Sequence, residues 1–136
     1  MTFHEGAESQ VTHIDFTDPY DESLRAALLE AARAAGEKIV DGGVYAATQG
    51  PRLETAAEIT RFERDGADVV GMTGMPEAAL AREAGLPYAA INVVANYAAG
   101  RGDSLHRIEF THIEATLQGA MARVHRILSR LCGEVA

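Results

Sequence analysis

Short apolar stretches alternate with longer amphipathic stretches along this chain, which is the pattern of an α/β protein. Val44 to Thr48, Asp68 to Met72 and Tyr88 to Ala95 are predicted strands. The last of them is apolar almost throughout, as is typical of a strand covered on both faces. Val11 to Ile14 alternates apolar and polar residues, which predicts a fourth, short strand. We therefore expect four strands in a largely parallel sheet with helical crossovers.

Helical spacing and end signals predict helices between these strands. The first begins at Asp18-Pro19, with proline at the first helical position, and ends at Gly36. The second begins with Thr55-Ala56-Ala57-Glu58, the pattern of a capping box, and ends near Gly66.

Two more helices follow the second predicted strand. Pro76 opens the third and Gly85 closes it. The last spans about 111–131, and its apolar side chains form one stripe. The stripe consists of Ile113, Leu117, Ala120, Met121, Val124, Ile127, Leu128 and Leu131.

Small or polar residues end three of the predicted strands. They are Thr48-Gln49-Gly50, Met72-Thr73-Gly74 and Asn96-Tyr97-Ala98. Ligands of open α/β sheets bind outside the carboxyl ends of the strands. The three strand ends therefore predict the floor of one pocket.

Composition narrows the function classes. The chain has 136 residues, which suits one domain, and its net charge of −8 argues against nonspecific binding of nucleic acid. A single cysteine, Cys132, fits a reducing compartment. We find no signal peptide and no apolar stretch of about 18 residues, so we expect a cytoplasmic protein without a membrane span.

Familiar catalytic and metal-binding motifs are absent from the sequence. There is no Walker loop and no nucleophile elbow. The five histidines have no paired spacing, so we expect no metal site. We place His112 on the solvated side or shoulder of the last helix.

Four residues at the strand ends each allow two interpretations. Glu54 either interacts with a helix dipole or accepts a hydrogen bond from a ligand ring N–H. Met72 and Thr73 are either a core residue and a turn residue, or an apolar platform beside an anion-binding hydroxyl. Asn96 either closes a turn or donates to and accepts from a heterocycle.

Three segments together resemble the trimeric purine nucleoside phosphorylase and methylthioadenosine phosphorylase family. They are 48–55 (TQGPRLET), 66–73 (GADVVGMT) and 96–100 (NYAAG), in family order. Within that family the chain is most similar to the bacterial S-methyl-5'-thioinosine phosphorylases. The resemblance implies part of a three-layer α/β/α fold with a central mixed, largely parallel sheet.

The resemblance also implies roles for individual residues. Met72 would lie against the ribose and Thr73 would contact phosphate. Asn96 would be the catalytic residue and would form the purine-binding strand end with Tyr97 and Ala98. The remaining substrate contacts would be Leu53, which stacks nearby, and Glu54 and Phe110, which tune the choice of base and 5'-group.

Asn96 and Glu54 bear on the choice of base. Family members that cleave 6-aminopurines carry aspartates where this chain has Asn96 and Ala98. An asparagine amide can donate to N7 and also meet a 6-oxo group, and Glu54 can accept from the N1–H that adenine lacks. Both residues favour a 6-oxopurine, because a mismatched base leaves buried polar groups unpaired.

The implied reaction is phosphorolysis of a purine nucleoside, S-methyl-5'-thioinosine, by phosphate as co-substrate and without a cofactor. Its implied partners are the nucleoside, phosphate and, in the complete form, two further copies in a homotrimer. Alternatives are a methylthioadenosine or general purine nucleoside phosphorylase, and a purine-binding module without activity. Family members are about twice as long, so we interpret residues 1–136 as the C-terminal half of the domain, without the N-terminal phosphate-loop half.

Overall fold

The computed structural model describes residues 2–6 and 10–133. Helices and strands alternate along most of the chain, which confirms the predicted α/β class. In chain order the elements are α1 (Glu22–Ala34), β1 (Tyr45–Ala47), α2 (Ala56–Arg64), β2 (Val69–Gly71), α3 (Gly74–Glu83), the short 3₁₀ helix η1 (Gly102–Ser104) and α4 (Phe110–Leu131).

The strands β1 and β2 pair in parallel, with α2 as the crossover between them. The register places Tyr45 opposite Val69 and Ala47 opposite Gly71. Beyond the last pair, the amide of Thr48 donates to the carbonyl of Gly71 over 2.8 Å. The two strands therefore end at the same edge, as the sequence predicted.

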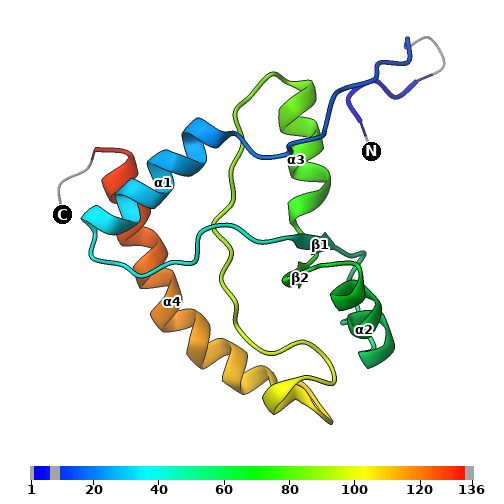
Figure 1. The fold of residues 1–136 in the computed structure, drawn as a ribbon, viewed down its shortest axis with the longest axis vertical. Coiled ribbons are helices and arrows are strands. Elements are labelled where there is room, and N and C mark those ends of the chain that lie inside the picture. The colour runs from blue at the N-terminus through cyan, green and yellow to red at the C-terminus, as the bar shows by residue number, and fades with distance from the viewer. Residues whose placement is uncertain (1, 7–9, 134–136) are drawn as a thin grey trace.

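The other two predicted strands are wrong. Among the described residues the sheet has two strands, and neither 11–14 nor 88–95 belongs to it. Residues 88–96 form an extended segment that passes between α4 and the sheet side of the molecule (Figure 1). A strand needs backbone partners along its length. Within the described part of the chain this segment has one such partner, the amide of Asp21, which donates to the carbonyl of Tyr88.

Local signals set the helix ends. Thr55 and Glu58 form the predicted capping box of α2, with both reciprocal hydrogen bonds present. The predicted start of α1 at Asp18-Pro19 is wrong, because Asp21 is the N-cap and its carboxylate accepts from the amide of Leu24. Met75 has extended dihedrals, so regular helix in α3 begins at Pro76 as predicted.

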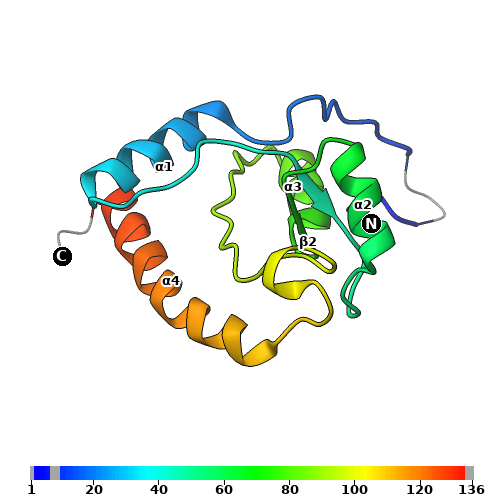
Figure 2. The ribbon, with the colours of Figure 1, turned by 60° about the horizontal axis from the view of Figure 1, so that its bottom comes forward.

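The main apolar core lies between α1 and α4. Leu28, Ala31 and Ala32 of α1 pack with Ile127 of α4, and Leu131 borders them. In both views α1 and α4 lie on one side of the molecule, while β1, β2, α2 and α3 lie on the other (Figures 1 and 2). The first residues of the extended segment, Ala89 and Ile91, pack against the core.

Much of the predicted apolar stripe of α4 is uncovered. Ile127 is buried, but Met121 and Leu128 are exposed by 54% and 42%. Phe110, at the first residue of the helix, and Val94 of the extended segment are also exposed, by 63% and 65%. The periodicity of α4 therefore predicts the helix correctly while more apolar surface stays in water than a closed core would leave. No helix in the described part of the chain is long and apolar enough to cross a membrane.

Candidate functional site

The carboxyl ends of β1 and β2 bring two of the three predicted strand ends together. Thr48 follows β1 and Met72-Thr73 follows β2, and the register joins these ends through the Thr48–Gly71 hydrogen bond. The sulfur of Met72 packs against Gly50, where an added Cβ would lie 2.5 Å from it. Gly50 therefore lets the loop after β1 approach the end of β2 closely.

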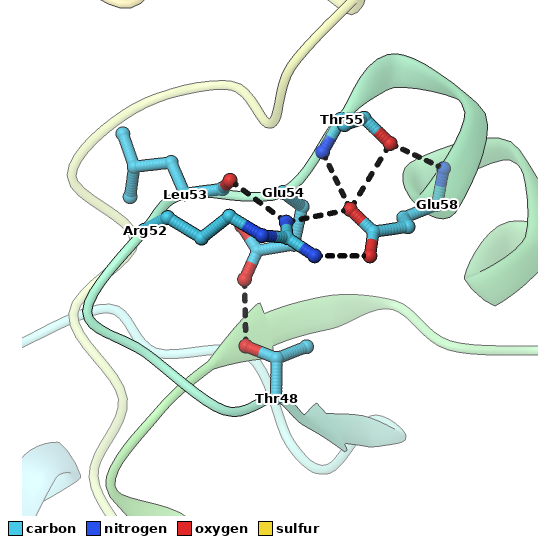
Figure 3. A network of polar contacts seen from close by, with 6 residues as sticks. All are labelled: Thr48, Arg52, Leu53, Glu54, Thr55 and Glu58. Carbon is cyan, nitrogen blue, oxygen red and sulfur yellow. Dashed lines mark hydrogen bonds and ion pairs between the residues drawn. The ribbon is translucent and has the colours of Figure 1, made fainter.

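Glu54 returns from this loop to the strand end. The hydroxyl of Thr48 donates to Oε1 of Glu54 over 2.6 Å (Figure 3). Glu54 is half-buried. Its carboxylate thus lies beside the sheet edge, while the acid that caps the helix amide of Thr55 is Glu58.

A second layer of contacts fixes the loop that carries Glu54. Arg52 donates through Nη1 and Nη2 to the two carboxylate oxygens of Glu58, over 2.8 and 2.7 Å (Figure 3). Arg52 and the hydrogen bonds from Thr55 lower the pKa of Glu58 to about 2. The carbonyl of Leu53 accepts from Arg52, and the Leu53 side chain points away from this network (Figure 3).

One cavity of about 280 Å³ opens beside this network. Both acids and two arginines contribute to its wall, so charges of both signs face it. Its lining residues are Ala47, Thr48, Gln49, Arg52, Glu54, Glu58, Arg61 and Phe62.

Asn96 and Tyr97 line a different cavity, also of about 280 Å³. One face of α4 and its N-cap supply its opposite wall, through Glu109, His112 and Thr116. The remaining lining residues are Val94, Ala95, Asp103 and Ser104. The side-chain amide of Asn96 donates to the carbonyl of the next residue, Tyr97, over 2.6 Å.

The structure does not place the eight predicted residues in one cavity. Glu54 lines the first cavity, and Asn96 and Tyr97 line the second. Five others line neither of these two, namely Leu53, Met72, Thr73, Ala98 and Phe110. Thr73 is exposed at the end of β2. The predicted roles of all eight residues stay predictions.

Three residues that sequence reasoning missed contribute to these surfaces. His112 and Ser104 line the cavity of Asn96, and Ser104 is buried, with 6% exposure. The spacing of Glu109, His112 and Thr116 places them on one helical face. That spacing was the sequence signal from which His112 could have been predicted to line a common surface. Tyr45 contacts the end of β2, and nothing in the sequence indicated that contact.

Comparison with known proteins identifies the family. A family model described as the phosphorylase superfamily matches residues 2–132. The chain belongs to the phosphorylase superfamily.

Several relatives of this phosphorylase-superfamily chain carry more specific names. It is 50% identical over 130 residues to a protein of Xanthomonas campestris pv. campestris named probable S-methyl-5'-thioinosine phosphorylase, covering 96% of this chain and 52% of the relative. It is 53% identical over 104 residues to a protein of Thermococcus kodakarensis named probable 6-oxopurine nucleoside phosphorylase, covering 73% and 39%.

A solved structure supports the same placement. Methylthioadenosine phosphorylase from Schistosoma mansoni in complex with adenine superposes with a TM-score of 0.88 at 26% identity. The match covers 96% of this chain and 52% of that one. The chain therefore spans about half the length of the relatives it matches most fully.

Proposed function

We propose that this chain takes part in phosphorolysis of a purine nucleoside, S-methyl-5'-thioinosine, to hypoxanthine and 5-methylthioribose 1-phosphate. The observation that carries the proposal is the position of Glu54. This half-buried residue lies where β1 and β2 end side by side, and its carboxylate accepts a hydrogen bond from the hydroxyl of Thr48. A carboxylate there can accept from the N1–H of a 6-oxopurine, which adenine lacks. The names of relatives about 50% identical to this chain agree with that preference.

In the proposed reaction a phosphate oxygen attacks C1' of the sugar while the C1'–N9 bond breaks. The electron pair of that bond passes to the purine, and the sugar carries oxocarbenium character in the transition state. Asn96 would donate to N7 and stabilise the negative charge that the purine gains. The protein supplies position and dipoles, and phosphate is the co-substrate.

The other assigned residues complete this proposal. Met72 would pack against the ribose, and the exposed hydroxyl of Thr73 would bind phosphate. Leu53, Tyr97 and Ala98 would contact the base, and Phe110 the 5'-methylthio group. We place the complete form in the cytoplasm as a homotrimer, with this chain forming its C-terminal half.

The test is phosphate-dependent release of base by the purified chain. Hypoxanthine release from methylthioinosine should exceed adenine release from methylthioadenosine. Glu54→Gln should reduce that preference, because an amide presents a donor as well as an acceptor to N1–H. The matched control is Glu114→Gln, since Glu114 is exposed on α4 and has no ion pair or hydrogen bond among the described residues. Equal release of both bases would contradict the proposed specificity.

A second candidate is a purine-binding module that needs a partner chain for chemistry. It is favoured by the division of the predicted residues between two cavities and by the half-length match to relatives. Hypoxanthine binding by calorimetry, without base release in the presence of phosphate, would select it. Release by the chain alone would exclude it.

A further inference from the structure

The hydroxyl of Tyr45 accepts hydrogen bonds from two backbone amides where β2 passes into α3. Its oxygen lies 3.3 Å from the amide nitrogen of Thr73 and 3.4 Å from that of Gly74. Tyr45 is on β1, opposite Val69 in the register, so its side chain extends along the sheet to the far end of the neighbouring strand. One side chain of β1 thus holds the turn that carries Thr73.

Two glycines make room for the Tyr45 ring. A Cβ added at Gly71 would lie 2.2 Å from the Tyr45 hydroxyl oxygen, and one at Gly74 would lie 2.9 Å from ring carbon Cε1. Neither distance is possible for a real side chain, because it is well inside van der Waals contact. The absence of a side chain at both positions is therefore what allows the phenol to reach the amides.

A second tyrosine holds the first turn of α3 from another direction. The hydroxyl of Tyr88 donates to Oε2 of Glu77 over 2.8 Å. The Tyr88 ring stacks on Tyr20 with ring centroids 6.0 Å apart. Burial, followed by the hydrogen bond to Glu77, raises the pKa of Tyr88 to about 12. The first turn of α3 is thus fixed by two phenols, one from β1 and one from the extended segment.

The N-cap of α3 differs from that of α2 in a way that matters for Thr73. Thr55 uses its hydroxyl to cap α2 by accepting from the amide of Glu58. Thr73 directly precedes Gly74, the first residue of α3, but the non-helical Met75 separates it from the regular helix and its hydroxyl makes no capping hydrogen bond. Threonine at this position normally satisfies a free helix amide with its own side chain. At α3 the hydroxyl of Tyr45 accepts from the amides of Thr73 and Gly74, and no hydrogen bond of the Thr73 hydroxyl is found among the described residues.

We propose that Tyr45 is a positioning residue, which holds the 72–74 turn and so directs the Thr73 hydroxyl toward phosphate. This inference rests on the proposed function, because it takes phosphate as the ligand of Thr73. Tyr45 itself does not touch phosphate. It acts by accepting the Thr73 and Gly74 amides, which keeps the turn in one conformation before phosphate binds.

The decisive variant is Tyr45→Phe, which removes the hydroxyl and keeps the ring. Amide hydrogen exchange by NMR should show Thr73 and Gly74 exchanging about tenfold faster, the effect of one lost hydrogen bond. Calorimetry with inorganic phosphate should show affinity weakened by about tenfold. Tyr20→Phe is the matched control, since no hydrogen bond of the Tyr20 hydroxyl is found in the described part of the chain, and it should change neither quantity.

A second variant approaches the same contact from the other side. Gly74→Ala keeps the Tyr45 hydroxyl but displaces its ring, so it should weaken phosphate binding as Tyr45→Phe does. Unchanged exchange and unchanged phosphate affinity in a folded Tyr45→Phe chain would overturn the proposal.

The outcomes also separate this inference from the proposed function. Phosphate binding that depends on Tyr45, without cleavage of any nucleoside, would support the positioning role and count against the activity. The unaltered chain could instead bind no phosphate while the amides of Thr73 and Gly74 exchange faster in Tyr45→Phe. That result would overturn the proposed role toward phosphate and leave Tyr45 as a structural cap of the turn.

Discussion

Arg52 and Glu58 form a bidentate ion pair that joins the loop after β1 to the first turn of α2. Both carboxylate oxygens accept from the guanidinium, at 2.8 and 2.7 Å, and the amide of Thr55 donates to the same carboxylate. The pair encloses the segment that carries Glu54, the residue on which the proposed base preference depends. We therefore expect a change in the stability of this loop to affect the proposed base preference.

Acid should weaken this loop in a defined pH range. The native pKa of Glu58 is about 2, against an ordinary value of 4.5. Because the folded chain binds this proton less tightly than the unfolded chain, Glu58 stabilises the fold above about pH 4.5 and loses that contribution as the pH falls toward about 2. Urea unfolding between pH 6 and pH 3 should show a smaller loss of stability in Glu58→Gln than in the unaltered chain. Identical pH dependence in the two would contradict the assignment, and Glu114→Gln is the control.

Removing the hydroxyl that caps α2 should destabilise the fold at neutral pH. Thr55→Ala deletes the acceptor for the Glu58 amide and should cost about 1 kcal/mol of unfolding free energy. Thr111→Ala is the comparison, because Thr111 is exposed in the first turn of α4 and no hydrogen bond of its hydroxyl is found among the described residues. Equal unfolding free energies for the two variants would show that the capping box contributes no stability.

Local signals account for what the sequence predicted correctly. The capping box at Thr55 and the start of regular helix at Pro76 each depend on a few neighbouring residues. Gly36 and Gly85 close their helices with φ of 69° and 67°, a conformation that glycine adopts without strain. Such signals need no knowledge of distant contacts. The pairing of β1 with β2 followed from the same logic, because one helix connects them.

Contacts between distant residues account for what the sequence did not predict. The apolar run at 88–95 indicates burial, but it cannot show whether a strand lies alongside. Asp18-Pro19 has the sequence pattern of a helix start, but α1 begins after Asp21. The carboxylate of Asp21 accepts a hydrogen bond from the amide of Leu24 and caps the helix. The contact of Tyr45 with Thr73 spans 28 residues and depends on the register of the sheet. No short motif encodes it.

Cleavage of methylthioinosine should slow when the amide of Asn96, in the extended segment, becomes an acid. Asn96→Asp removes the donor proposed for N7 and should lower hypoxanthine release by about 10² to 10³, the effect of losing one preorganised donor. The measurement is the rate of methylthioinosine cleavage, in whichever form of the chain is active. An unchanged rate would remove Asn96 from the proposed mechanism.

The phosphate requirement should change when the hydroxyl at the end of β2 is removed. Thr73→Ala should raise the KM for phosphate more than the KM for the nucleoside, because Thr73 is exposed and its hydroxyl makes no capping hydrogen bond. Steady-state kinetics with each substrate varied in turn measures both values. Equal increases would indicate a general structural defect in place of a lost phosphate contact.

The isolated chain should associate with itself or with other polypeptide. Among residues 2–6 and 10–133, the extended segment 88–96 has one backbone hydrogen-bond partner, Asp21, and its Val94 side chain is 65% exposed. Met121 of α4 and Phe110 at its start add exposed apolar surface, at 54% and 63%. Unpaired extended backbone and exposed apolar side chains favour association. Contact with another chain can satisfy the backbone hydrogen bonds and bury the apolar side chains.

Light scattering on the purified chain measures this directly, and we expect a mass above that of one 14.5 kDa chain. Replacing Val94 and Met121 with lysine should lower the measured mass, because lysine makes each of these surfaces costly to bury. Two exposed residues elsewhere, Thr12 and Thr111, provide the matched lysine control. A monodisperse monomer that unfolds cooperatively would show that the two strands and four α-helices of the described residues form a stable unit alone. That result would also favour a self-contained purine-binding module over half of a nucleoside phosphorylase.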